Sequence, residues 1–559
     1  MMTNDAIADH FSLLSKLMDI HGENAFKAKS YATAAFTIDK LSTPLSEMDP
    51  QKIAGIRGIG DSVSQKIMEL LQTGQLGLLT EILSKTPPGI LDMLRIKGIG
   101  PKKIATIWKE LEIETLGELL YACNENRLTL YKGFGEKTQA SIKAAIEFFL
   151  QSQGRFLYQQ VEEWALSLDQ KLKSSFPIAQ WSLTGEFRRQ MEIIDVLAWV
   201  TTLSASDLTA FAATQDWQLM EAIDSSLLFK TTENLQLQFF AVTPSAFHAQ
   251  LFQTSCSAEF LAAWAKEAGW DPAFPFGSED EIFNAANVCP IPPYQRETVD
   301  MIEAYRHNEM PAVIETADIV GLVHCHSQWS DGGHSLEEMR SACKARGWTY
   351  MVISDHSKSA FYANGLNEER LLAQQAQIDA LNAADPSFTI FKSIESDILN
   401  DGQLDYAPAV LSSFDLVIAS VHSNLKMAED KAMMRLLRAI ENPYTSILGH
   451  MTGRLLLSRN GYPIDHEKII DACFANQVVI ELNAHPRRLD IDWRWIRKAL
   501  DKNVLLSINP DAHTLAGLDD VRYGVLVAQK AGLSKSRNLS SFDRSAFLQF
   551  VALQKRKRP

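Results

Sequence analysis

Residues 319–326 read IVGLVHCH, a short apolar run that ends in His324 and His326. Six further runs of this kind follow, separated by helical stretches: YMVISDH, FTIFKSIES, FDLVIASVH, TSILGH, VVIELNAH and VLLSINPDAH. Strands that alternate with helices are typical of a parallel β/α fold. The seven units therefore predict a β/α barrel, with polar residues at the carboxyl ends of its strands, where barrel active sites lie.

Histidines and acidic residues gather at the ends of these predicted strands. His324 and His326 are two positions apart, so both imidazoles should project to one face of a strand. Other strand ends deliver Asp331, His356, Glu395 with Asp397 nearby, His422, His450, Asp511 and His513. Imidazole and carboxylate without thiolate suit manganese, zinc or iron, and this set exceeds what one ion can use. We expect two or three divalent ions that share a bridging carboxylate.

A site of this kind predicts phosphoester hydrolysis. Bound ions lower the pKa of a water molecule to about 7 and clamp the attacking and leaving oxygens of a phosphoryl centre. Arg454, Arg487 and Arg488 are candidates for holding phosphate bidentately. The alternative is that these histidines are structural residues of an ordinary barrel, although seven of the 13 in the chain sit at or just after strand ends. The catalytic candidates are His324, His326, Glu395, Asp511 and Arg454.

These motifs resemble the polymerase and histidinol phosphatase (PHP) domain. Its motifs are matched in order by HCHSQWSDG, SDHS, IESDI, ASVHSN, GHMTGR and NPDAH, between residues 324 and 513. The resemblance covers about residues 312–545 and implies a distorted (β/α)7 barrel with a trinuclear metal site. It departs from many relatives at Leu322, where they have an acidic residue. The ligands it implies are His324, His326, Asp331, His356, Glu395, His422, His450, Asp511 and His513.

The length, composition and net charge of the chain limit the classes of protein to which it can belong. With 559 residues the chain exceeds one hydrophobic core, and 46% hydrophobic and 22% charged residues are ordinary for a globular protein. No apolar stretch approaches the roughly 18 residues of a membrane span, and the polar start is unlike a signal peptide, so we expect a cytoplasmic protein. The six scattered cysteines suit reduced thiols. A net charge of −14 means that any nucleic-acid binding must come from local patches or backbone amides.

The first 150 residues show helical periodicity and a repeated Gly-Φ-Gly turn, where Φ is apolar. The copies are GIRGIG from Gly55, RIKGIGPKK from Arg95 and YKGFGEK from Tyr131. Each opens a helix whose free N–H groups form an anion site suited to DNA phosphate, although a plain helix hairpin also favours glycine. Such binding is independent of sequence. The predicted DNA-binding residues are Gly55, Gly58, Gly60, Lys66, Gly98, Gly100, Lys102, Lys103, Gly133 and Gly135.

These turns resemble helix-hairpin-helix motifs, and residues 1–150 resemble the N-terminal part of a bacterial family X DNA polymerase. FKAKSYATAA at 26–35 and GIGDSVSQKIMELLQTG at 58–74 carry that likeness. In relatives with deoxyribose-phosphate lyase activity, the residue matching Lys66 forms a Schiff base, with those matching Lys27 and Tyr31 nearby. The alternative for Lys66 is an ordinary lysine on a helix surface.

The same resemblance implies a polymerase palm after residue 154, which lacks its metal ligands. A two-metal nucleotidyl transferase needs three carboxylates. The sequence GEFRR at 185–189 is followed by Ile193 at the first carboxylate position, Asp195 at the second and Gln236 at the third. A shifted alignment would recruit Glu192 instead. We therefore expect a degenerate palm that has lost polymerase activity.

The predicted architecture is multidomain: an all-α helix-hairpin-helix region, an α+β nucleotidyltransferase-like palm and a C-terminal PHP barrel. The predicted boundaries are 1–82 for a helical DNA-end-binding domain, 83–153 for a fingers-like helix-hairpin-helix domain, 154–289 for the palm and thumb, 290–311 for a linker and 312–559 for the phosphoesterase domain.

The expected function is DNA repair by a manganese-dependent 3′-5′ exonuclease that acts on gapped DNA or accessible ends, with cleavage at abasic sites as in relatives. Three alternatives stay open: a phosphatase for a small phosphorylated metabolite, an active gap-filling DNA polymerase and a non-catalytic DNA-binding scaffold. The hairpin repeats speak against the metabolite enzyme, and the complete ligand set speaks against the scaffold.

Overall fold

The computed structural model describes residues 2–39, 41, 43–96, 98–151, 154–310 and 312–559. The chain forms two compact units: the first comprises residues up to 124 and 128–149, and the second comprises residues 125–127 and 150–559. The predicted boundaries at residues 153 and 311, and Lys97 in the second glycine turn, lie outside the described residues. None of the described helices is both long and apolar enough to cross a membrane.

The first unit is helical throughout its described residues, as predicted. Apolar residues on α1 and α2 pack against each other, and Phe11 meets Tyr31 with ring centroids 5.8 Å apart. The helices are α1 (Asn4–His21), α2 (Ala25–Asp39), α3 (Pro50–Ile53), α4 (Asp61–Thr73), α5 (Gly77–Ser84), α6 (Pro88–Met93), α7 (Pro101–Lys109), α8 (Leu116–Asn124) and α9 (Glu136–Gln151).

The three glycine turns share one backbone conformation. The first glycine of each turn has a left-handed φ, at +97° for Gly58, +95° for Gly98 and +96° for Gly133, a region that L side chains rarely adopt. The apolar residue of each turn is buried, and the flanking glycines are exposed. Helices α4, α7 and α9 begin directly after the turns. The turns therefore present exposed backbone at three helix N-termini.

The second unit begins with a mixed layer of helices and sheet. One five-stranded sheet has the order β2-β4-β7-β6-β5, in which only β4 and β7 are parallel, and β1 pairs with β3 beside it. The strands are β1 (Phe156–Leu157), β2 (Trp181–Thr184), β3 (Ile193–Ile194), β4 (Val196–Thr201), β5 (Gln218–Ile223), β6 (Ser226–Lys230) and β7 (Gln236–Ala241). The helices are α10 (Tyr158–Ser175), α11 (Gly185–Arg188), α12 (Ala205–Thr214), α13 (Phe247–Thr254), α14 (Ala258–Ala268) and α15 (Glu279–Ala285).

Residues 290–310, the described part of the predicted linker 290–311, contain helix α16 (Asp300–Arg306) and pack into the unit. Ile291, Met301 and Ile302 join the apolar cluster around Phe252. Arg296 is buried and forms an ion pair with Glu279 at 2.6 Å. The prolines that suggested a linker lie in a short turn before this helix.

Eight parallel strands follow, and they lie in two sheets of order β10-β9-β8 and β11-β12-β13-β14-β15. Strands β10 and β11 are separated only by Ser393 and Ile394, so the strands occupy seven positions. Parallel bridges from Cys325 to Ala512 and from His356 to Glu395 join the two sheets. The strands are β8 (Leu322–Cys325), β9 (Tyr350–Ile353), β10 (Thr389–Lys392), β11 (Glu395–Asp397), β12 (Ile418–Ser420), β13 (Ile447–Leu448), β14 (Val479–Asn483) and β15 (Leu506–Asn509).

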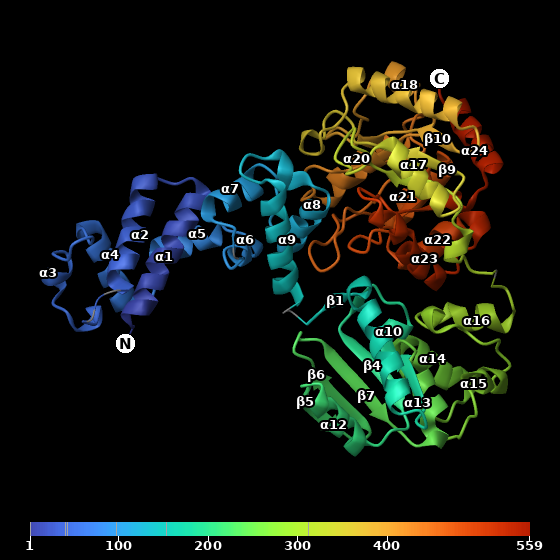
Figure 1. Ribbon diagram of the computed structural model, residues 1–559, viewed down its shortest axis with the longest axis horizontal. Helices are drawn as coiled ribbons and strands as arrows, with labels where there is room; N and C mark the ends of the chain where they lie inside the picture. Colours follow the sequence, from blue (N-terminus) through green and yellow to red (C-terminus); the bar gives the residue numbers. More distant parts are fainter. Residues whose placement is uncertain (1, 40, 42, 97, 152–153, 311) are drawn as a thin grey trace. The chain divides into compact units, whose positions relative to one another are not determined.

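Helices alternate with these strands, and all of them except α19 are labelled in Figure 1. They are α17 (Leu336–Ala345), α18 (Glu368–Ala384), α19 (Pro408–Leu411), α20 (Glu429–Ile440), α21 (His466–Ala475), α22 (Trp493–Asp501), α23 (Val521–Lys530) and α24 (Arg544–Arg556).

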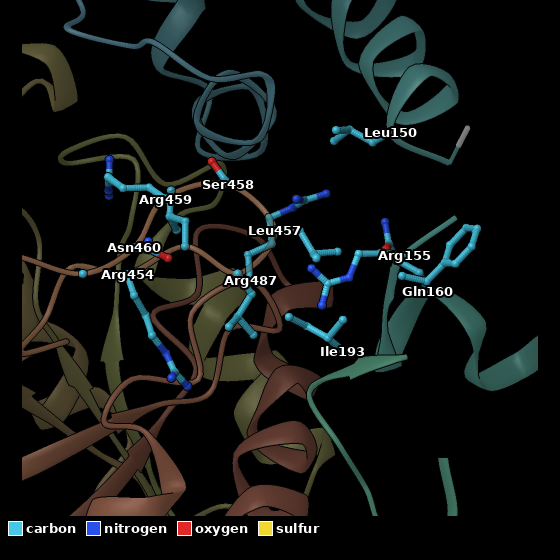
Figure 2. Close-up of a pocket in the computed structure, with 14 residues that line it drawn as sticks. Leu150, Arg155, Gln160, Ile193, Arg454, Leu457, Ser458, Arg459, Asn460 and Arg487 are labelled. Carbon is cyan, nitrogen blue, oxygen red and sulfur yellow. The ribbon is translucent and has the colours of Figure 1, made fainter. Parts of the chain in front are cut away.

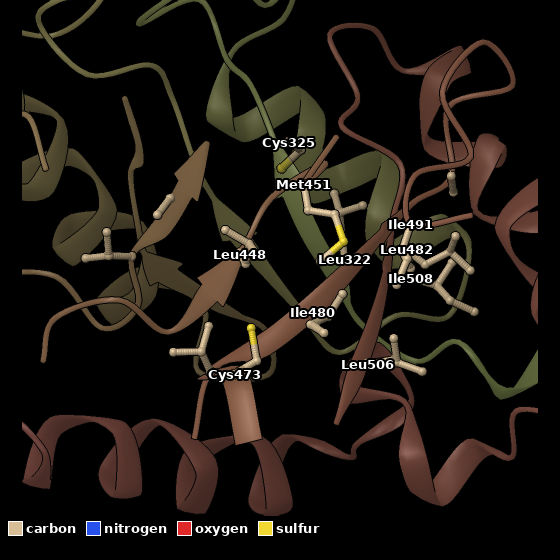
Figure 3. Packing of buried hydrophobic residues seen from close by; sticks show 14 of the residues in the cluster. Leu322, Cys325, Leu448, Met451, Cys473, Ile480, Leu482, Ile491, Leu506 and Ile508 are labelled. Atoms are coloured by element: carbon tan, nitrogen blue, oxygen red, sulfur yellow. The ribbon is translucent and has the colours of Figure 1, made fainter. Parts of the chain in front are cut away.

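Alternate strand residues enter two apolar clusters. Leu448, Ile480 and Ile508 belong to the larger cluster, which includes buried residues of the alternating helices (Figure 3). Their strand neighbours, such as Ile447 and Val479, belong to a second cluster that α24 completes. This division follows from the two-residue period of a strand.

A substitution of Phe547 in α24 tests how much the second apolar cluster stabilises the fold. Its side chain is fully buried, and its ring lies 4.3 Å from that of Tyr350. Phe547→Ala should lower the free energy of unfolding by about 3–5 kcal/mol because it leaves a cavity, as measured by chemical denaturation. Leu548→Ala, at a neighbouring side chain that is 49% exposed, is the control and should change it by less than about 0.5 kcal/mol. Equal effects of the two substitutions would contradict the assigned packing.

Candidate metal centre

A bulge in β8 aims His324, which lies in the strand, and His326, which follows it. The register with β9 shifts between Val323 and Cys325, so His324 is the extra residue, and its φ is +63°. Val323 packs in the cluster completed by α24, whereas Cys325 packs in the larger cluster. The bulge lets both imidazoles approach the same carboxylates, at 3.4 Å for His324 and 3.6 Å for His326 from Glu395.

Glu395 stands at the centre of the site. Its Oε1 lies 3.0 Å from His422 Nε2 and 2.9 Å from His450 Nε2. Its Oε2 lies 3.1 Å from His356 Nδ1. One carboxylate therefore contacts five imidazoles, which is the arrangement expected of a ligand that bridges ions.

The remaining predicted ligands are Asp331, Asp511 and His513, and each lies close to another ligand of the cluster. His326 Nε2 is 2.9 Å from Asp511 Oδ1, and Asp331 lies 3.4 Å from His513 and 3.6 Å from His356. Eight of the nine predicted ligands fall into three groups whose ligand atoms lie within 4.8 Å of one another, and His450 adjoins them through Glu395. The groups are His326, Asp331, His356 and His513; His324, His326, Glu395 and Asp511; and His356, Glu395 and His422.

Burial and mutual charge set the protonation of these groups. Burial, with His513 and His356 adding to it, lowers the pKa of His326 to about 3. Burial also opposes protonation of His422, but the carboxylates of Glu395 and Asp397 outweigh it and raise its pKa to about 10. Burial alone would raise the pKa of Glu395, yet the surrounding histidines hold it well below its usual range. Cationic partners thus stabilise the central carboxylate.

The donor set fits divalent ions. Several buried atoms of the cluster have no hydrogen-bond partner among the described residues, and each such atom costs about 1–3 kcal/mol. Ions bound between them would satisfy these atoms without any rearrangement of the fold. His356 contributes both of its ring nitrogens, which have ion-pair contacts but no hydrogen bond. The other atoms are His324 Nε2, His326 Nδ1, Asp331 Oδ2, Glu395 Oε2, His450 Nδ1 and His513 Nε2.

Fully buried Glu481 is a supporting residue that the sequence interpretation missed. Its Oε2 accepts a hydrogen bond from Asn509 Nδ2 at 2.7 Å and lies 2.6 Å from His324 Nδ1. Its Oε1 accepts from the backbone N–H of His450 at 3.0 Å. A carboxylate behind a ligand histidine fixes its tautomer and ring orientation. The available signal was an acidic residue inside the apolar run VVIEL.

Two further buried carboxylates support neighbouring ligands. Asp397 lies 2.5 Å from His422 Nδ1 and therefore orients that ring toward Glu395. Asp355 accepts from the backbone N–H of Ser327 at 2.8 Å and from Gln374 Nε2 at 2.5 Å. It thereby fixes the loop that carries Asp331.

Arg454, a catalytic candidate, is engaged away from the ligand atoms. Its guanidinium donates to the backbone oxygens of Arg488, at 2.9 Å, and Leu489, and it forms an ion pair with Asp492. These contacts favour a role in positioning the loop after β14. Arg488, on that loop, lies 3.9 Å from Asp511.

The three residues predicted to mark a degenerate palm lie in β3, between β3 and β4, and at the start of β7. Ile193 lies in β3, and Gln236 pairs with Val196, the residue after Asp195. Asp195 Oδ1 accepts from Arg155 Nε at 2.7 Å. Among the described residues, the groups of side chains able to hold a metal ion all lie in the barrel.

The predicted DNA-contacting and lyase residues lie in the first unit. Lys103 lies 5.7 Å over the ring of Phe134, so it links the second and third glycine turns. Lys66 is half-buried, Lys27 is exposed and Tyr31 is buried, which raises the pKa of its hydroxyl. The lyase assignment stays a prediction.

Some known proteins and family models match parts of the chain, and one known protein matches nearly all of it. Two family models match, a helix-hairpin-helix domain over residues 2–76 and a SAM-like helix-hairpin-helix tandem over residues 90–147. DNA polymerase/3′-5′ exonuclease PolX of Bacillus subtilis (strain 168) is 33% identical over 548 residues, 93% of this chain and 94% of the relative. A probable phosphatase of Thermoanaerobacter sp. (strain X514) is 27% identical over 178 residues, 30% of this chain and 70% of the relative.

A substitution of Glu481 tests whether a buried carboxylate behind a ligand histidine supports metal binding. Glu481→Gln keeps the side-chain shape but removes the charge beside His324 Nδ1, so Mn²⁺ affinity should fall about 10- to 100-fold in isothermal titration calorimetry. Glu467→Gln, at an exposed residue that pairs with Lys498, is the matched control and should bind Mn²⁺ like the unmodified chain. Equal affinities for the two variants would exclude this role for Glu481.

Proposed function

Because the chain belongs to the family of DNA polymerase/3′-5′ exonuclease PolX, we propose that its barrel is a PHP domain that hydrolyses DNA from 3′ ends with Mn²⁺. The predicted resemblance to bacterial family X polymerases is confirmed by the relative from Bacillus subtilis. The observation that carries the proposal is the buried cluster around Glu395, in which five imidazoles and further carboxylates converge.

The cluster supplies ligands for two or three ions. Glu395 would bridge them, with His324, His326 and Asp511 on one side and His356 and His422 on the other. When bound, such ions supply a nucleophile at neutral pH and stabilise charge on a phosphoryl group. Around them, Glu481 and Asp397 hold the rings of His324 and His422 in place. Pre-set ligands of this kind require little reorganisation when the substrate arrives.

The helix-hairpin-helix units point to DNA as the substrate. Their exposed glycines sit at helix N-termini, where backbone N–H groups favour phosphate. Binding of this kind needs no basic excess, in keeping with the net charge of −14. It is also independent of sequence, which suits an enzyme that recognises gapped DNA or free ends. We therefore place the protein in DNA repair, with abasic-site cleavage as a further activity of the same centre.

A metabolite phosphatase is the second candidate, favoured by the match to probable phosphatases over 178 residues. An enzyme for a small metabolite has no use for two helix-hairpin-helix units. We therefore rank the phosphatase second. The palm is proposed to be inactive because an apolar side chain, an arginine-paired aspartate and a glutamine occupy its carboxylate positions.

The barrel's role can be measured with 3′-end-labelled gapped DNA. The chain should release nucleotides in Mn²⁺ and none in chelator, and His324→Ala combined with His326→Ala should lower the rate at least 100-fold because it removes two ligands. His307→Ala, at an exposed histidine outside the cluster, is the control and should retain the rate. Hydrolysis of a small phosphomonoester but not of DNA would instead favour the phosphatase.

Primer extension tests the palm. On gapped DNA with all four deoxynucleoside triphosphates, the double histidine variant should leave primers at their original length, because its exonuclease is removed and the palm lacks a metal-binding set. Template-directed extension that disappears in Asp195→Ala would contradict the degenerate palm.

A further inference from the structure

An arginine-lined pocket lies within the second unit, between the palm edge and the barrel loops (Figure 2). Its volume is about 540 Å³. Arg155 and Ile193 line it from the palm side, and Arg454, Arg459 and Arg487 line it from the loops after β13 and β14. Ligand sites usually measure about 300–1,000 Å³. The pocket therefore has room for nucleotides of a single strand and not for a duplex.

The lining is positively charged in an acidic protein. It carries four arginines, and none of its described residues is acidic, although the chain has a net charge of −14. Arg155 pairs with Asp195, and Arg454 pairs with Asp492 and, at 3.9 Å, with Glu192; none of these carboxylates lines the pocket. A concave surface lined by one sign of charge concentrates counter-ions of the other sign. Arginine also matches phosphate in geometry.

Apolar groups alternate with these charges. Phe156, Ile193 and Leu455–Leu457 lie in the same lining, together with Gln160 and Asn460. Charged groups that follow a backbone, combined with aromatic side chains on which bases stack, are the components of single-strand binding sites, and Phe156 is the aromatic side chain of this lining. This composition favours a nucleic-acid strand over inorganic phosphate.

The pocket is linked to the metal centre through the loop after β14. The backbone N–H of Arg487 donates to His485 Nδ1 at 3.2 Å, and the backbone N–H of His485 donates to Asn483 Oδ1 at 3.1 Å. Asn483 Nδ2 then donates to Asp511 Oδ2 at 3.0 Å. Arg454 follows the predicted ligand His450 by four residues. A strand bound in the pocket would therefore contact the loop after β14, whose hydrogen bonds lead to the predicted ligand Asp511.

We propose that this pocket binds the phosphodiester backbone of the single DNA strand whose 3′ end is cleaved in the barrel. The assignment rests on the proposed exonuclease function. It gives the degenerate palm a use: its former catalytic edge, now bearing Ile193 and the Arg155–Asp195 pair, forms one wall of the strand's path.

The test measures binding of fluorescein-labelled (dT)12 to the full chain by anisotropy, in chelator so that no cleavage occurs. Arg155→Gln with Arg459→Gln should raise Kd at least about tenfold, because each arginine bonds a charged phosphate. The slope of log K against log salt should fall by about 1.4, for two single-strand phosphates. Arg306→Gln with Arg346→Gln, at two ion-paired arginines elsewhere in the unit, is the control and should leave both values unchanged.

A substitution that removes a negative charge beside the pocket should have the opposite effect on binding. Asp195→Asn removes the acid that pairs with Arg155 at the exposed edge and should tighten (dT)12 binding about two- to fivefold. Unchanged Kd and slope in the double arginine variant would overturn the assignment. Loss of thymidine triphosphate binding without loss of (dT)12 binding would overturn it too, because the pocket would then hold a free nucleotide. If the binding changes appear but no nucleotide is released in Mn²⁺, the exonuclease proposal fails while the pocket assignment stands.

Discussion

The carboxylate of Glu395 has contacts with five imidazoles, and the rest of the barrel can be understood from what that contact requires. Five histidines from four different strand ends must bring ring nitrogens within 4 Å of one buried group. Only a closed set of parallel strands delivers so many side chains to one point. A buried carboxylate without such partners would be strongly disfavoured, because charge burial is costly unless the charge is paired.

Two ligand positions are held in strained backbone. His324 has a φ of +63° and Asp511 a φ of +54°, conformations that cost about 1–3 kcal/mol each outside glycine. Both residues are fixed by neighbours: Glu481 lies against His324, and Asn483 donates to Asp511. Glu481 and Asn483 are two positions apart on β14. One strand therefore supports both strained ligands, which links the apolar core beneath it to the geometry of the site.

The structure brings the predicted ligands together, but the way in which they are assembled was not predicted. Alternation along a strand correctly groups His324 with His326, but the structure achieves this with a bulge that no periodicity indicates. Glu481 and Asp355 escaped notice because a buried acid in an apolar run has no pattern until its partners are known. Arg454 looked catalytic from its place after His450, yet its guanidinium holds backbone oxygens and Asp492. The helix starts after the glycine turns were predicted, because a helix start depends on local sequence.

Strand limits and the predicted linker depended on tertiary packing. The run FTIFKSIES is divided into β10, which pairs with β9, and β11, which pairs with β12. Between them, the backbone N–H of Ser393 bonds to Ile353 at the end of β9, and that of Glu395 bonds to Asp355 beyond it. Residues 290–310 fold because their apolar side chains complete a cluster built by other helices. In the proposed enzyme these packed regions hold the inactive palm and the barrel as parts of one compact unit.

The central claim is that the cluster around Glu395 is the metal centre of the chain, and anomalous diffraction at the manganese edge tests it most directly. Crystals of the full chain grown with Mn²⁺ and a short single-stranded oligonucleotide should show two or three manganese peaks bridged by Glu395, with the 3′ end of the strand beside them. Manganese bound at Asp195 in the palm, with none at Glu395, would contradict the account.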